Sequence, residues 1–240
     1  MTDGKAKPGA KDSKDSKDAK DAKDPKRATA GGGENTAIRE RRRQQLIEST
    51  IASIAKRGFA ETTMGDVAKG AKLSHGIVNF HFKSKEQLLV ETLRYMTEEY
   101  RAVWTRAVEK AGPGVADKLA AHYLADLDPA VCTRKKVAVW HAFYGEAKSR
   151  PTYREICGAR DQERSNAGLR LVRWIIEDGA YRHLDPEETA RGLEALSDGL
   201  WLRLLLSADK FDREGARRTV LAFLACVFPK HFAFAERDAA

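Results

Sequence analysis

The amino-acid sequence predicts an all-α fold, in which a small N-terminal three-helix unit precedes a larger helical domain. From Thr36 onward, apolar residues recur at steps of three and four, the spacing of one face of an α-helix. No stretch shows the sustained alternation of a half-buried strand. Residues that cap helices (Ser, Thr, Asp) and residues that end them (Gly, Pro) divide the chain into helical lengths.

Length and composition exclude several classes of protein. The chain has 240 residues, and its longest apolar run, Val220 to Phe228, is far shorter than the roughly 20 residues that cross a bilayer. Its three cysteines, Cys132, Cys157 and Cys226, are widely spaced and form no metal or disulfide motif. No apolar segment follows the N-terminal lysines, as a secretory signal would require. We therefore expect a soluble, cytoplasmic protein without membrane contact.

Residues 1–35 are expected to form a disordered Lys/Asp-rich tail. They contain repeated Lys-Asp pairs and almost no apolar side chains to offset the entropy of ordering. Residues 1–33 carry nine Lys and Arg against six Asp, whereas residues 34–96 carry eleven against seven acidic residues. The remaining 144 residues are almost neutral, so the basic excess lies in the first third of the chain. Because alternating charges bind a polyanion weakly, the segment after the tail is the better candidate for contact with nucleic acid.

The first unit, residues 36–95, begins with an amphipathic helix that ends at Gly58, a common residue type after a helix. Its polar face starts with a group of arginines whose position favours nonspecific phosphate contact, although a solvated face is the simpler interpretation. The group consists of Arg39, Arg41, Arg42 and Arg43.

Three N-caps follow this helix. Thr63, with an acidic residue three positions on, opens a short second helix, and Ser74 opens a third. Ser84 and Gln87 form a Ser-x-x-Gln capping box, whose helix is predicted to run to Gly112. Within the third helix, Phe80 and Phe82 are expected to pack inside the three-helix unit.

The larger domain, residues 96–236, is predicted to add five helices. The breaks at Pro129, Pro151, Gly179, Pro186 and Asp212 separate them. Their expected spans are 114–127, 130–149, 152–179, 186–207 and 213–235.

Residues 63–82 have the pattern of a helix-turn-helix. The first helix would brace the second, whose N-terminal half enters a DNA major groove about 12 Å wide. Ser74, His75 and Gly76 would then lie at the DNA, with Gly76 allowing close approach. Hydrogen-bonding side chains of the same segment could reach base edges or phosphates, and the free amides at helix N-termini could bind phosphate. These side chains are His75, Asn79 and His81, and these N-termini include Thr63 and Ser74.

The motif resembles the DNA-binding unit of the TetR family of repressors. The resemblance rests on the runs Thr62–Ala68, Leu73–Val78 and His81–Leu89. It implies a homodimer that binds a palindromic operator of double-stranded DNA through residues 63–82, with Lys85 reaching phosphate. It also implies a C-terminal domain for ligand binding and dimerisation, in which a bound ligand separates the two DNA-binding units.

Two residues depart from the family pattern. Lys72 stands where Gly is usual in the turn, so a left-handed conformation there would cost about 1–2 kcal/mol. Asn79 stands where most members have Tyr, which removes or replaces one phosphate contact.

Further similarity to choline-responsive members of the family covers about residues 36–230, including Ala138–Phe143 and Asp198–Arg203. A quaternary ammonium cannot donate a hydrogen bond, so aromatic faces and a nearby carboxylate must recognise it. Helical spacing suggests two groups of such residues, although core or dimer packing also explains large aromatics at this spacing. The candidate ligand-binding residues are Trp140, Phe143, Tyr144, Trp174, Asp198 and Trp201.

These features favour a DNA-binding repressor of genes for choline-to-glycine-betaine synthesis or transport, released by choline or a related ligand. A family member that responds to another small hydrophobic or cationic ligand is the main alternative. A DNA-coating protein that uses its basic tail is a further one. The sequence offers no catalytic residues, metal-ligand cluster or cofactor motif, so an enzyme is not expected.

Overall fold

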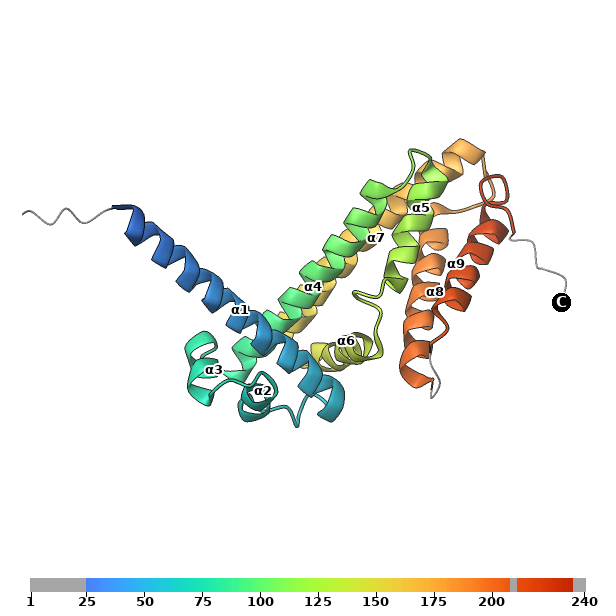
Figure 1. Ribbon diagram of the computed structural model, residues 1–240. Helices are drawn as coiled ribbons and strands as arrows, with labels where there is room; N and C mark the ends of the chain where they lie inside the picture. Colours follow the sequence, from blue (N-terminus) through green and yellow to red (C-terminus); the bar gives the residue numbers. More distant parts are fainter. Residues whose placement is uncertain (1–24, 208–210, 235–240) are drawn as a thin grey trace, which may run out of the picture. The chain divides into compact units, whose positions relative to one another are not determined.

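The computed structural model describes residues 25–207 and 211–234, which form helices and connections but no strand (Figure 1). This confirms the all-α prediction. By their contacts, the described residues divide into one part that ends at Arg41 and another that begins at Arg42. The helices are α1 Pro25–Arg57, α2 Met64–Gly70, α3 His75–His81, α4 Lys85–Lys110, α5 Val115–Leu124, the 3₁₀ turn η1 Ala125–Leu127, α6 Arg134–Ala147, α7 Pro151–Gly179, α8 Pro186–Leu206 and α9 Arg213–Val227.

The predicted disordered tail lies partly outside the described residues, which begin at Pro25. Its last part, residues 25–35, was predicted wrongly, because α1 already includes these residues. Proline has a backbone angle that suits the first turn of a helix. Extending an existing helix is also far less costly than starting one, so α1 can continue beyond the apolar pattern that identified it.

Helices α2 and α3 pack with the second half of α1 and the start of α4. Leu46, Val67, Val78, Phe82 and Leu89 are buried between them. These residues come from all four helices, so one small core fixes the angle between α2 and α3.

The predicted helix N-caps are all present, but their bonding differs. At Thr63 the side chain and that of Asp66 form a complete capping box. Ser84 accepts a hydrogen bond from the Gln87 amide, whereas the Gln87 side chain accepts from the Lys83 amide, which is one residue before the predicted partner. Ser74 is the N-cap of α3 without a side-chain cap bond.

Helix α4 crosses the predicted domain boundary at residues 95 and 96. Its first turns bury Leu88 and Leu93, and its later turns bury Tyr100 and Trp104. No Gly or Pro interrupts the helix, so a rigid element connects the helix-turn-helix with the larger domain.

Helix α7 is central in the larger domain, where it packs against α4, α5, α6 and α8. Helix α9 ends at Val227, earlier than the predicted residue 235, because Pro229 lacks a backbone N–H and disfavours helical geometry in the residue before it. In the described part of the chain, every helix is too short or too polar to span a membrane.

The turn between α2 and α3 contains the predicted strain, because Lys72 has a φ of 55°. Glycine adopts this conformation without penalty, so Lys72→Gly should raise the free energy of unfolding by about 0.5–1 kcal/mol. Urea denaturation measures this change. The matched control is Lys69→Gly in α2, which should lower stability by about 1 kcal/mol. Equal destabilisation by both variants would contradict the assignment of strain to Lys72.

His122 of α5 should make stability depend on pH. Its ring is fully buried, and its two nitrogens have no hydrogen-bond partner among the described residues. Burial, with Arg164 and Arg170, holds its pKa well below the usual value. The unfolded chain therefore binds a proton that the folded chain excludes. As pH falls below about 6.5, this residue should reduce stability by up to about 1.4 kcal/mol per pH unit.

Thermal unfolding between pH 7.5 and pH 5.5 tests this expectation. His122→Phe should flatten the pH dependence, whereas His183→Gln, at an exposed histidine, should retain it. An unchanged slope in His122→Phe would show that other groups cause the pH dependence.

Candidate functional site

The helix-turn-helix exposes one face of α3. His75, Gly76 and Asn79 are exposed on it, and the Asn79 amide nitrogen lies 3.1 Å from Nδ1 of His75. A Cβ added at Gly76 would have as its nearest neighbour the Ser74 hydroxyl, at 3.8 Å. The space beside Gly76 is therefore open to a partner.

The other predicted DNA-binding residues have varied environments. The Thr63 hydroxyl is used in the capping box and donates to Asp66 at 2.7 Å. Lys85 donates through Nζ to the Ala60 carbonyl at 3.0 Å, from a partly exposed position. His81 is half-buried at the end of α3, where its ring meets that of Phe80 edge to face.

Phe80 is the one wrong packing prediction in α3, since 68% of its surface is exposed, whereas Phe82 is buried as predicted. Positions two apart lie on opposite sides of a helix, while positions four apart share a side. Val78 and Phe82 are four apart and both point into the core. Phe80 consequently lies on the side of α3 that carries the exposed Gly76, four positions before it, and helical spacing would have identified it.

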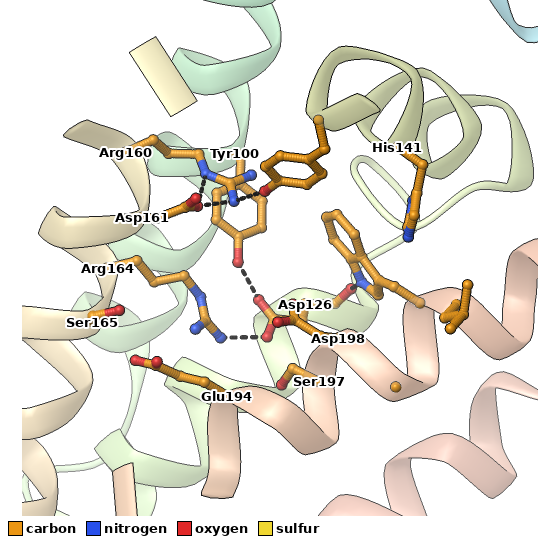
Figure 2. Close-up of a pocket in the computed structure, with 14 residues that line it drawn as sticks. Tyr100, Asp126, His141, Arg160, Asp161, Arg164, Ser165, Glu194, Ser197 and Asp198 are labelled. Carbon is orange, nitrogen blue, oxygen red and sulfur yellow. Dashed lines mark hydrogen bonds and ion pairs between the residues drawn. The ribbon is translucent and has the colours of Figure 1, made fainter. Parts of the chain in front are cut away.

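A second candidate site is a cavity of about 520 Å³ in the larger domain, a volume in the range of small-molecule pockets. Figure 2 shows side chains from α4, η1, α6, α7 and α8 converging on it. Four carboxylates line the cavity against two guanidinium groups, giving it an acidic excess. The acids are Asp126, Asp161, Glu194 and Asp198, and the bases are Arg160 and Arg164.

Three of the six predicted ligand-binding residues, Tyr144, Asp198 and Trp201, line this cavity. Trp140 is buried behind it and stacks on Tyr144, with ring centroids 6.1 Å apart. Burial raises the pKa of the Asp198 carboxyl above its ordinary value, and Arg164 is the main opposing influence.

The predictions for Phe143 and Trp174 are not supported by their positions. Phe143 points into the core between Phe59 and Tyr153, because it lies about 100° around α6 from its neighbour Tyr144. Trp174 is 44% exposed on α7, several turns beyond Arg160, and does not line the cavity.

A buried polar network forms the floor of the cavity (Figure 2). Asp126, only 2% exposed, is paired with Arg164 and accepts a hydrogen bond of 2.6 Å from the Tyr100 hydroxyl. Its backbone carbonyl accepts from the Trp201 indole at 2.8 Å. Residues far apart in the sequence meet here, and sequence analysis missed Tyr100, Asp126 and both arginines. The four-residue spacing of Arg160 and Arg164 was the available signal.

Arg160 lies against aromatic rings beside this network. Its guanidinium carbon is 4.3 Å from the Trp140 ring centroid, 4.9 Å from that of Tyr100 and 5.7 Å from that of Tyr144. Nε donates to Asp161 at 2.7 Å, and Nη2 donates to the Tyr144 hydroxyl.

Aromatic and charged contacts join the helix-turn-helix to the larger domain. We call the group of Phe59, Glu86, Phe143, Arg150 and Tyr153 the interdomain joint. The ring of Phe143 meets that of Phe59 edge to face at 5.5 Å and that of Tyr153 at 5.3 Å. Arg150 lies over both of these partner rings and is 2.8 Å from the Glu86 carboxylate. Helix α6 therefore contributes to the cavity and to the joint.

An exposed helix-turn-helix and a separate cavity, joined by packed helices, define a ligand-binding transcriptional regulator. Two family descriptions match the chain: "Bacterial regulatory proteins, tetR family" at residues 46–92 and "BetI-type transcriptional repressor, C-terminal" at residues 115–229. The chain belongs to the TetR family of transcriptional repressors, and its C-terminal domain is of the BetI type.

Similar proteins agree with this assignment. The HTH-type transcriptional regulator BetI of Paraburkholderia xenovorans is 32% identical over 79% of this chain and 95% of its own length. A TetR-family regulator from Rhodococcus sp. has a solved structure with 25% identity and a TM-score of 0.66, covering 78% of this chain and 99% of its own. A regulator from Saccharomonospora viridis, solved with choline, shares the fold at 22% identity and a TM-score of 0.67, covering 76% and 94% of the two chains.

The exposure of Phe80 predicts a role outside the core. Phe80→Ala should change the free energy of unfolding by less than about 0.5 kcal/mol, whereas Phe82→Ala should cost about 3–5 kcal/mol. Urea denaturation of both variants measures these values. Large destabilisation by Phe80→Ala would mean that its ring belongs to the core after all.

Proposed function

We propose that this protein represses genes for choline-to-glycine-betaine synthesis or transport, and that choline or a related quaternary ammonium releases it from a palindromic operator. The observation that carries the proposal is the acidic, aromatic-lined cavity between α4, α6, α7 and α8. Ring faces and carboxylates attract a quaternary ammonium without hydrogen bonds. Similarity to proteins named BetI, and a shared fold with a regulator solved with choline, support the same ligand class.

Helix α3 is proposed to enter the major groove through its exposed face. His75 and Asn79 could reach base edges, Gly76 would allow close approach, and Phe80 could contact a thymine methyl group. Phosphate contacts are assigned to the helix starts at Thr63 and Ser74 and to Lys85, with His81 at the end of α3. Lys85 would exchange its hydrogen bond with Ala60 for a phosphate oxygen.

Two copies of the chain are proposed to form the operator-binding species. Exposed apolar side chains on α8 and α9 support a dimer contact there, among them Leu202, Leu206 and Phe223. Trp201 does not belong to this exposed group, because it is buried and its indole donates to Asp126. The two α3 helices would occupy successive major grooves about 34 Å apart.

Ligand binding would change the spacing of the α3 helices through two elements. Helix α4 carries Tyr100 at the cavity, and only three residues separate its start from the end of α3. Helix α6 carries Tyr144 at the cavity and Phe143 in the interdomain joint. A ligand that moves either helix therefore acts on the DNA-binding unit, and it favours release to the extent that it binds the released state more tightly.

The two arginines of the cavity support a second ligand candidate, a zwitterion with a carboxylate such as glycine betaine. Arg160 and Arg164 could pair with that carboxylate. A repressor of the same family with another small cationic or hydrophobic ligand is the remaining alternative.

Titration of choline, betaine aldehyde and glycine betaine into the protein–operator complex tests the proposal. Fluorescence anisotropy of labelled operator should show release by choline. Asp198→Asn should raise the choline concentration needed by about tenfold, because a carboxylate beside the cation is lost. Glu187→Gln, at an exposed acid of α8, is the matched control. Failure of all three ligands to release the operator would contradict the proposed regulation.

Operator affinity measured without ligand tests DNA binding separately from release by a ligand. The logarithm of the affinity should fall steeply with the logarithm of salt concentration, because phosphate contacts release counterions. A flat dependence would contradict docking of α3 in the groove. Deletion of residues 1–24 should leave the preference for the operator sequence intact. If the protein instead coated DNA through its basic tail, the deletion would abolish DNA binding.

A further inference from the structure

The side chain of Arg160 occupies the place of a cationic ligand. We call Tyr100, Trp140 and Tyr144 the aromatic cage, because their three rings surround the Arg160 guanidinium at 4.3–5.7 Å. A cation within about 6 Å of a ring centroid is in the range of a cation–π interaction. The rings come from α4 and α6, whereas the cation comes from α7.

The guanidinium is buried and bonded within this arrangement. Arg160 is only 9% exposed, and its Nη2 donates to the Tyr144 hydroxyl at the rim of the cage. Nη1 is buried and has no hydrogen-bond acceptor anywhere in the part of the chain that the structure describes. Ring faces thus take the place of an acceptor for this nitrogen.

We propose that Arg160 is a resident cation of the aromatic cage, which a quaternary ammonium must displace in order to bind there. This inference rests on the proposed function, because it specifies how that cavity selects its ligand. A second cation in the cage would lie a few ångströms from the Arg160 guanidinium, and like charges at that distance repel strongly in a site shielded from water. A cation that binds in the cage therefore requires Arg160 to leave.

A displaced Arg160 side chain would still have a charged partner nearer to solvent. Asp161 accepts a hydrogen bond from its Nε, and the Asp161 side chain is 45% exposed. Nη2 pairs with the same carboxylate, so the arginine can keep this partner if the two neighbouring side chains turn toward solvent together. Arg164 has no such freedom, because it is paired with the buried Asp126.

Displacement also breaks a link between helices. Arg160 connects α7 with Tyr100 of α4 and Tyr144 of α6, the two helices that lead to the DNA-binding unit. A neutral molecule can fill the cavity without competing for the cage. Charge, rather than size alone, thus decides which ligands alter this link.

Isothermal titration calorimetry of the full chain without DNA tests the inference, with choline and its neutral isostere 3,3-dimethylbutan-1-ol as probes. Arg160→Met should bind choline about tenfold or more tightly than the wild type, because like-charge repulsion is removed. The gain for the neutral isostere should be clearly smaller. Tyr144→Phe keeps the ring but loses the hydroxyl that holds Arg160, so it should also bind choline more tightly, by about threefold.

Arg173→Met is the matched control, since it removes an exposed positive charge from the same helix without touching the cage. Its choline affinity should equal that of the wild type. Circular dichroism verifies the fold of each variant, and Tyr144→Phe serves if Arg160→Met does not fold. Unchanged or weaker choline binding in the folded variants, equal gains for both probes, or no choline binding by any protein would overturn the inference.

Operator binding by the same preparations separates the two proposals. If choline binds as expected but does not release the operator, the proposed regulation is wrong, whereas the inference that choline displaces Arg160 is supported. If the operator is bound normally but the choline affinities differ from those expected, the inference about Arg160 is wrong, whereas the proposal of DNA binding is supported.

Discussion

Apart from the continuous helix α4, the DNA-binding unit is joined to the larger domain by one packed contact, the ring of Phe143 between those of Phe59 and Tyr153. Phe59 precedes the helix-turn-helix, and Phe143 lies on the helix that carries part of the cavity wall. Edge-to-face aromatic pairs have defined geometry, so they transmit a movement of α6 instead of absorbing it. Arg150 reinforces the contact through the Glu86 carboxylate at the start of α4.

Four carboxylates and two guanidinium groups line the cavity. Asp126 and Arg164 form a buried pair that would be costly to break, since the remaining charge would lack a partner. Arg160 and Asp198 are the groups that a ligand can rearrange. Arg160 lies against ring faces and pairs with the partly exposed Asp161, and burial raises the pKa of the Asp198 carboxyl. In the proposed mechanism, a cationic ligand that displaces Arg160 gains Asp198 as a partner.

Local features of the sequence predicted much of this structure. Thr63 and Ser84 were identified as caps because capping depends on a few neighbouring residues, and Pro151 and Pro186 marked two helix starts correctly. The cavity was less accessible to prediction. Of the residues predicted to bind a ligand, Tyr144, Asp198 and Trp201 line the cavity, whereas Phe143 points into the core and Trp174 lies outside the cavity. The partners of Arg160 come from helices α4 and α6, and no sequence spacing reveals their convergence.

Thermodynamic coupling between the two sites is the central claim, and reciprocity measures it directly. Calorimetric choline affinity should be lower for the operator-bound protein than for the free protein, by the same factor by which saturating choline weakens operator binding. Phe143→Leu should reduce both factors together, because it loosens the contact between α6 and the DNA-binding unit. Equal choline affinity with and without operator would contradict the account.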